Sequence, residues 1–340
     1  MEDTPHVPLP EGNPIEPTAP TAPEPLPVPP QPSLLRRIFK GPNGIRAGWR
    51  LLIYVAIVAA LLAVIHLLRG HHHESKQTLE KPGPTIIGEW LGFAVFAFAA
   101  WVMSRIEKQP WSNYGLPPRK AFRSNFWIGA FFGFVALSCV MGCLRLAHCY
   151  YIDSVALHGL EVWKFAGLWL LAFLGVGFAE EFVARGYLQF TLASGMKFWP
   201  AAVLTAALFT FGHVKNDGET ILGLTDVFLF GMLACFMWWR TGDLWLAAGF
   251  HAFWDWGLSF FYSVPDSGMS AMGHLFNIRV QGPAWLSGGS AGPEGSVINI
   301  IFDVLYFVII ALAFPRRQFA GWTRPPKENI GPEQVSVVAG

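Results

Sequence analysis

The sequence of 340 residues is poor in charged side chains and in cysteine, and both shortages exclude functions. Only 14% of its residues are charged, against about 25% in an ordinary soluble domain. The net charge of +1 offers no basic surface of the kind that nucleic acid requires, so we expect no nucleic-acid partner. The four cysteines form no CxxC pair, which argues against a disulfide framework and against a thiolate zinc site.

The first 33 residues lack the apolar run of a signal peptide. Between Pro5 and Pro32 the chain contains twelve prolines and no lysine or arginine. A segment of this composition does not bury enough apolar surface to offset the entropy of ordering. We therefore predict a disordered, Pro-rich tail over residues 1–33.

Long apolar stretches dominate the remainder, and 53% of all residues are hydrophobic. Because a helix needs about 20 apolar residues to cross a membrane, we predict an all-α, polytopic integral membrane bundle of about eight transmembrane helices. The predicted segments are 51–68, 85–104, 126–146, 165–179, 199–213, 221–239, 244–262 and 297–314.

Basic residues precede the first apolar segment, fill the second connection, and follow the fourth, sixth and last segments. Cytoplasmic loops are enriched in lysine and arginine, so this pattern predicts that both termini are cytoplasmic. The predicted divisions are a tail (1–33), two helices with their connection (34–124), a core (125–262), an irregular outer loop (263–296), a last helix (297–315) and a second tail (316–340).

Ionisable residues inside apolar segments cost about 2.5–3.5 kcal/mol each and therefore indicate function. Glu180 and Glu181 follow directly on the fourth segment. Arg185 lies four residues after Glu181, so the two share a helix face and can pair. Glu180 is turned about 100° away and has no such partner, which suits a general base. A structural ion pair at a helix end explains this motif equally well.

Two histidines follow in later segments. Phe209 and His213 close the fifth segment, four residues apart, and His251 and Asp255 have the same spacing in the seventh. A carboxylate at that spacing can hold an imidazole in one tautomer. A lone membrane histidine is usually a packing residue. Together with the glutamate pair, however, these residues provide a base, a proton carrier and a hydrogen-bond donor, the groups with which water attacks a carbonyl.

Two further acids, Asp226 and Asp303, lie in the sixth and eighth segments. Neither belongs to a motif. Snorkelling or hydrogen bonds between helices account for isolated acids of this kind, so we assign no catalytic role to either.

In chain order, the patterns EExxxR, FxxxH and HxxxD resemble the three motifs of the CPBP intramembrane proteases, also called the Abi family. That family includes the type II CAAX prenyl endopeptidases and bacterial proteins of bacteriocin processing and immunity. The resemblance covers about residues 125–261, and the stretch 111–117 is similar to an aromatic Gly-Leu stretch before the family's core. It implies an endopeptidase of the bacterial cytoplasmic membrane that acts on a prenylated, CAAX-like or membrane-embedded peptide or protein.

The resemblance also implies a role for each residue. Glu180 and His213 would activate water, and His251 would stabilise the oxyanion beside Asp255. The family often has asparagine at the last position, and an ionised aspartate accepts hydrogen bonds without donating one. Asp255 is then either protonated or serves to orient His251. The supporting residues would be Glu181, Arg185 and Phe209.

Metal dependence and two other function classes stay open. Two histidines and a glutamate also occur as ligands of catalytic zinc, but the sequence lacks the HExxH helix of zinc proteases, so we assign no cofactor and no metal ligand. One alternative is a non-catalytic membrane scaffold or bacteriocin-immunity protein that retains the motifs. The other is a transporter with a proton relay, for which we would expect repeated halves with broken helices.

The depths of two predicted catalytic residues disagree. At about 1.5 Å per helical residue, Glu180 lies about 8 Å from Arg185, whereas His213 lies about 20 Å beyond Trp199. If Arg185 and Trp199 mark the same membrane face, the two side chains cannot meet. A tilted fifth helix, or one that begins later, would remove the conflict.

Overall fold

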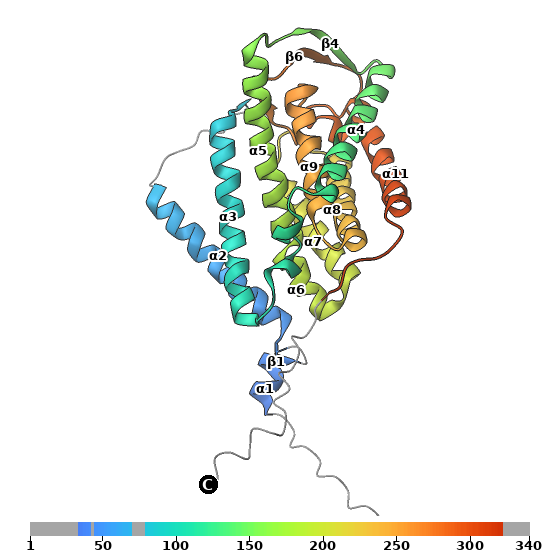
Figure 1. Ribbon diagram of the computed structural model, residues 1–340. Coiled ribbons are helices and arrows are strands. Elements are labelled where there is room, and N and C mark those ends of the chain that lie inside the picture. Colours follow the sequence, from blue (N-terminus) through green and yellow to red (C-terminus); the bar gives the residue numbers. More distant parts are fainter. Residues whose placement is uncertain (1–32, 42–43, 70–78, 322–340) are drawn as a thin grey trace, which may run out of the picture.

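The computed structural model describes residues 33–41, 44–69 and 79–321. The predicted tail 1–33, apart from its last residue, and the end of the tail 316–340 lie outside the described residues. Helices standing side by side form most of the described chain (Figure 1), in agreement with the prediction of a helical bundle.

The main helices are α1 (Leu34–Phe39), α2 (Ala47–Arg69), α3 (Pro82–Glu107), α4 (Ser124–Leu146), α5 (Leu160–Arg185), α6 (Tyr187–Met196), α7 (Phe198–His213), α8 (Ile221–Thr241), α9 (Trp245–Trp256), α10 (Ala284–Ser287) and α11 (Val297–Ala313). Short turns are the 3-10 helices η1 (Trp111–Tyr114), η2 (Pro118–Lys120) and η4 (Pro293–Gly295) and the π-helical turn η3 (Gly257–Phe261).

Strands occur as three short pairs. β1 (Lys40–Gly41) and β2 (Gly44–Ile45) are antiparallel, β3 (Leu79–Glu80) and β5 (Ser270–Ala271) are parallel, and β4 (Tyr150–Val155) and β6 (Phe276–Val280) are antiparallel. The segment 263–296, which we predicted to be irregular, thus contains β5, β6, α10 and η4.

Five helical segments of the described chain have the length and apolarity to cross a membrane: α2, α3, α4, α5 together with α6, and α8. The prediction of a helical membrane protein is confirmed, but length and composition support five crossings, not eight. The other three predicted segments form α7, α9 and α11, with 16, 12 and 17 residues. Each is shorter than the roughly 20 residues that a crossing needs.

Two arginines mark one end of the bundle. Arg50 near the start of α2 forms an ion pair of 3.4 Å with Glu107 at the end of α3, and it also contacts Ser194 of α6. Arg240 at the end of α8 donates to the carbonyl oxygen of Pro315, 2.7 Å away. We call this the basic end. The pair β4–β6 lies at the opposite end (Figure 1), which we call the strand end.

Helices α4 and α9 approach until their backbones touch. A Cβ on Gly133 would lie 2.2 Å from the carbonyl oxygen of Phe250, and one on Gly249 would lie 2.2 Å from that of Phe126. Glycine is therefore required on both sides of the contact, as at close helix crossings in membranes. The contact fixes the helix that carries His251.

Helix α6, which we did not predict, resolves the conflict of depths. It begins after the break at Gly186, and its ten residues extend the chain by about 15 Å before α7 begins. Arg185 therefore lies inside the bundle and not at its basic end. Glu180 and His213 come to similar depths, about 23 and 22 Å from the start of α7. The apolar pattern missed this helix because it is interrupted by Gln189, Thr191 and Ser194.

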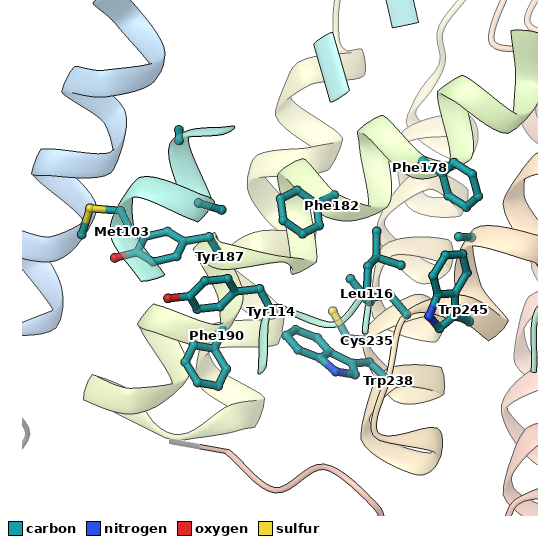
Figure 2. Packing of buried hydrophobic residues seen from close by; sticks show 14 of the residues in the cluster. Met103, Tyr114, Leu116, Phe178, Phe182, Tyr187, Phe190, Cys235, Trp238 and Trp245 are labelled. Atoms are coloured by element: carbon teal, nitrogen blue, oxygen red, sulfur yellow. The ribbon is translucent and has the colours of Figure 1, made fainter. Parts of the chain in front are cut away.

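Aromatic side chains fill the junction of α5 and α6 (Figure 2). Trp111 stacks on Phe182 with 5.3 Å between ring centroids, and Tyr114 meets Tyr187 edge-on at 5.1 Å. Such pairs contribute about 0.5–1.5 kcal/mol each beyond their buried area. The stretch 111–117 therefore supports the helix junction directly below the glutamate pair.

Candidate active site

A cavity of about 640 Å³ lies among α3, α5, α7, α8, α9 and α11. Its size is typical of ligand sites in proteins. All four predicted catalytic residues and Phe209 line it. Toward the strand end its lining includes Glu80 of β3 and residues of the 263–296 segment.

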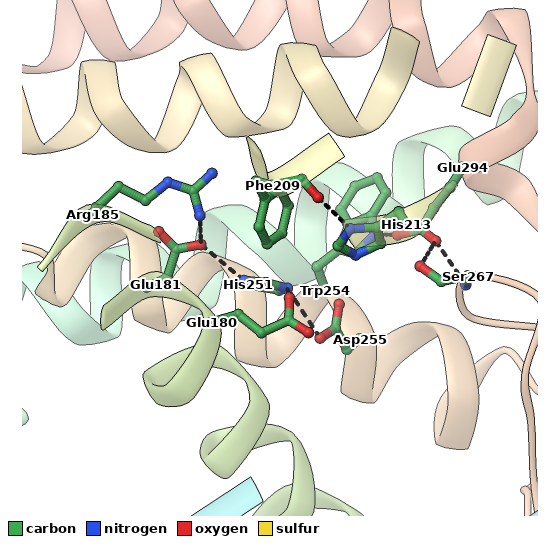
Figure 3. A network of polar contacts seen from close by, with 10 residues as sticks. All are labelled: Glu180, Glu181, Arg185, Phe209, His213, His251, Trp254, Asp255, Ser267 and Glu294. Atoms are coloured by element: carbon green, nitrogen blue, oxygen red, sulfur yellow. Dashed lines mark hydrogen bonds and ion pairs between the residues drawn. The ribbon is translucent and has the colours of Figure 1, made fainter. Parts of the chain in front are cut away.

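His251 is the centre of a group of carboxyl side chains in this cavity (Figure 3). Its Nδ1 lies 2.9 Å from Oε1 of Glu181, so Nδ1 carries a proton and donates it. Its Nε2 lies 3.6 Å from Oε2 of Glu180 and 3.4 Å from Oδ2 of Asp255. The second nitrogen therefore has two acids near it and retains room to bind a small group in the cavity.

Glu181 and Arg185 form the buried support behind His251. Oε1 of Glu181 accepts from Nη1 of Arg185 at 3.0 Å, and neither side chain is exposed. The predicted pair is confirmed. The guanidinium also lies over the Phe209 ring at 4.5 Å, a cation–π contact. One carboxylate oxygen thus joins the arginine to the histidine.

His213 lies on the other side of Phe209. Its Nδ1 lies 2.8 Å from the carbonyl oxygen of Phe209 and donates to it, which leaves Nε2 of a neutral ring as an acceptor. Within the described chain, no ion pair of 4.0 Å or less joins His213 to Glu180. The structure therefore brings the four predicted residues to one cavity, but the histidine that Glu180 meets is His251.

The acidity of the cavity was missed by sequence reasoning. Its lining holds eight carboxyl residues and, among the described residues, no lysine or arginine. Burial, followed by the neighbouring Glu294 carboxylate, raises the pKa of Asp266 well above its usual range. Asp226 and Asp303 were visible in the sequence as acids in apolar segments, whereas no spacing pointed to the acids of the 263–296 segment. The eight are Glu80, Glu89, Glu180, Asp226, Asp255, Asp266, Glu294 and Asp303.

Three of these acids come close together. Ligand oxygens of Asp255, Asp266 and Glu294 all lie within 4.8 Å of one another. Glu294 is held in place by Nε1 of Trp254 at 3.1 Å and by the backbone N–H of Ser267 at 2.9 Å. A set of carboxylates suits hard cations better than zinc. Neither His213 nor His251 belongs to this group. The described residues therefore give no further support for a zinc site.

Comparison with known proteins points to the same part of the chain. Residues 162–257 match the family described as type II CAAX prenyl endopeptidase, Rce1-like, a protease family. The match begins near the start of α5 and ends after α9, so it is shorter than the resemblance over 125–261 and excludes 111–117. No curated protein sequence matches the chain significantly. The matched stretch contains every predicted catalytic residue, and residues 162–257 are therefore similar in sequence to the Rce1-like type II CAAX prenyl endopeptidases.

Proposed function

We propose that this protein is an intramembrane endopeptidase that hydrolyses a peptide bond of a CAAX-like, lipidated or otherwise membrane-associated polypeptide. One observation carries the proposal: Oε2 of Glu180 lies 3.6 Å from Nε2 of His251 on the cavity wall. The Glu180 side chain is 35% exposed, so it reaches the cavity, whereas the partner on the far side of the imidazole, Glu181, is fully buried.

We assign one group of the cavity to each step of the hydrolysis. Glu180 takes a proton from a water that Nε2 of His213 also holds, and the water oxygen attacks the carbonyl carbon. His251, protonated at Nε2 between Glu180 and Asp255, donates to the oxyanion. Glu180 then returns the proton to the amine nitrogen as the C–N bond breaks. Glu181 and Arg185 act as positioning residues, because they reach the substrate through His251.

The test is cleavage by the purified full chain in lipid nanodiscs. The probes are a farnesylated CAAX peptide and a membrane-spanning peptide, each with a quenched fluorophore. We expect Glu180→Gln and His251→Asn each to lower kcat by about 10³-fold, within the range of lost acid–base catalysis. Cleavage that persists after chelation would exclude a required metal.

The matched control is Glu161→Gln on the same helix. Glu161 is exposed, pairs with Lys164 at 3.1 Å and lies outside the cavity, so its substitution should leave kcat unchanged. Cleavage by Glu180→Gln within a few-fold of the unaltered protein would contradict the mechanism. Folded variants that lose no cellular function would instead support the scaffold alternative.

We also propose eight crossings, with both termini on the cytoplasmic side and 125–262 as the catalytic core. The basic end of the bundle supports this orientation, since it contains the start of α2 and the end of α3. The short helices α7, α9 and α11 pack among the five longer segments, which supports their place in the membrane. Labelling of single cysteines from each side of intact vesicles tests the arrangement.

A further inference from the structure

Three polar residues of the cavity wall have no part in the proposed hydrolysis. Asp226 of α8 and Asn299 and Asp303 of α11 are 4%, 2% and 5% exposed. Asn299 and Asp303 are four residues apart and share a helix face. Nδ2 of Asn299 donates to Oδ1 of Asp226 at 2.7 Å, so of the two explanations given for Asp226, the hydrogen bond between helices is present.

That hydrogen bond does not satisfy every side-chain oxygen of the cluster. Oδ1 of Asn299 and Oδ2 of Asp303 are buried and have no hydrogen-bond partner among the described residues. Each such atom costs about 1–3 kcal/mol if it stays unsatisfied. Both residues line the cavity. A cluster that served packing alone would be expected to pair these atoms within the protein, so the unpaired oxygens indicate a donor that comes from outside the chain.

The charge of the wall indicates which donor this is. Asp226 and Asp303 lie close enough to share a hydrogen bond, and among the described residues that line the cavity no lysine or arginine accompanies them. Glu294 adds a third carboxylate nearby, because η4, which carries it, packs against both α8 and α11. A cation that enters would pair with these carboxyl groups as they ionise. The expected donor is therefore a cation.

We propose that Asp226, Asn299, Asp303 and Glu294 form a cation subsite that takes a lysine or arginine side chain of the polypeptide substrate. The inference rests on the proposed function, because it assumes that a polypeptide enters the cavity. An ammonium brings three N–H donors and a guanidinium five, and neither accepts, which matches a wall of open oxygens. The apolar stem of such a side chain also suits the apolar part of the wall.

The subsite lies beside the proposed catalytic centre. Glu294 approaches Asp255 within 4.8 Å, and Asp255 lies 3.4 Å from His251. The basic residue of the substrate would therefore lie close to the bond that is cleaved. The cavity then selects its substrate by charge as well as by membrane association.

The experiment measures binding, so that it does not depend on cleavage. Fluorescent farnesylated peptides bind to the full chain in nanodiscs, in a Glu180→Gln background that prevents turnover. At each position near the lipidated cysteine, one residue is lysine, norleucine or glutamate. We expect one position at which lysine binds at least ten-fold more tightly than norleucine, and glutamate more weakly than either.

The double variant Asp226→Asn with Asp303→Asn should reduce this lysine preference to less than two-fold. Asparagine at position 226 still accepts from Asn299, so the helix contact is kept, and melting temperatures verify folding. Glu161→Gln should keep the preference. A second arm measures melting with Mg²⁺ or Ca²⁺ alone.

The outcomes separate the two proposals. Absence of lysine preference at every position, or a preference that survives the double variant, overturns the subsite. Stabilisation by a divalent ion that the double variant abolishes assigns the site to a metal and also overturns it. Lysine-selective binding without cleavage of any peptide by the unaltered protein would overturn the proposed protease function and leave the subsite standing. Peptide cleavage that does not depend on the charge of the peptide would overturn the subsite and leave the proposed protease function standing.

Discussion

The buried pair of Glu181 and Arg185 is the sharpest place to test how the site is held. The change is Glu181→Gln, which keeps the shape of the side chain and removes its charge. Because both side chains are fully buried, the arginine is then left charged inside the bundle. Its Nε and Nη2 have no hydrogen-bond partner in the described part of the chain, so no second acceptor there replaces the lost carboxylate.

The expected loss of stability can be worked from the contact. At 3.0 Å, the attraction of two unit charges is about 5 kcal/mol at an effective dielectric constant of about 20. Removing one partner of a buried ion pair typically costs about 3–5 kcal/mol. Glutamine retains an oxygen that accepts a hydrogen bond, worth about 1 kcal/mol. We therefore expect Glu181→Gln to lower the free energy of unfolding by about 2–4 kcal/mol.

A double variant separates stability from catalysis. Arg185→Met together with Glu181→Gln removes the stranded charge, so most of the lost stability should return. The rate should not return, because His251 lacks its anionic partner at Nδ1 in both variants, and we expect kcat to stay about 100-fold low. Unfolding free energies from steric trapping in bicelles and peptide cleavage in nanodiscs provide the two measurements.

Two results would refute this reasoning. A loss below about 1 kcal/mol in Glu181→Gln would show that the arginine does not depend on this carboxylate. A double variant as unstable as the single one would show that the stranded charge is not the cause.

Other predictions address the helix contact, the unusual aspartate and the strand end. Gly133→Ala should lower stability by about 1–3 kcal/mol, because its Cβ would lie 2.2 Å from the Phe250 carbonyl oxygen; Gly142→Ala on the same helix meets open space and should not, and equal melting temperatures would contradict the contact. Asp255→Asn should keep kcat within about ten-fold, since asparagine also donates, whereas Asp255→Ala should lower it about 100-fold; equal losses would deny Asp255 a polar role. Because burial raises the pKa of Asp266, the folded state holds this proton more tightly than the unfolded chain, so its contribution to stability is full below about pH 4 and is lost as the pH rises toward the raised pKa. In Asp266→Asn, melting curves recorded from about pH 4 to about pH 8 should not show this loss of stability with rising pH. A variant whose melting temperature depends on pH as strongly as that of the unaltered protein would refute the prediction.

The local features of this site could be predicted from the sequence, because they depend on helical spacing. Glu181 with Arg185 and His251 with Asp255 are four residues apart, and the helix brings each pair together. The helical membrane class followed from composition in the same way. These predictions needed no knowledge of which helices are neighbours.

What the sequence did not reveal depends on contacts between distant segments. The approach of His251 to both glutamates joins α5 and α9, 70 residues apart, and is possible because glycines hold α9 close to its neighbours. The carboxylates of Asp266 and Glu294 reach the cavity through a segment without periodicity. Helix α6 was not predicted because a hydropathy pattern does not distinguish a short helix with a polar face from a loop.

The glycine contacts of α9 also determine which parts of the site can adapt. Helix α4 touches α9 through backbone atoms, and a Cβ on Gly177 of α5 would lie 2.9 Å from the carbonyl oxygen of Ala248 on α9. Helices packed this closely have no room to slide, so His251 keeps its position whatever occupies the cavity. The 263–296 segment, by contrast, is joined to the start of α3 through the two-residue pair β3–β5, and it carries two of the cavity's acids. Acceptance of new substrates should therefore arise by change in this segment, while the histidine centre stays as it is.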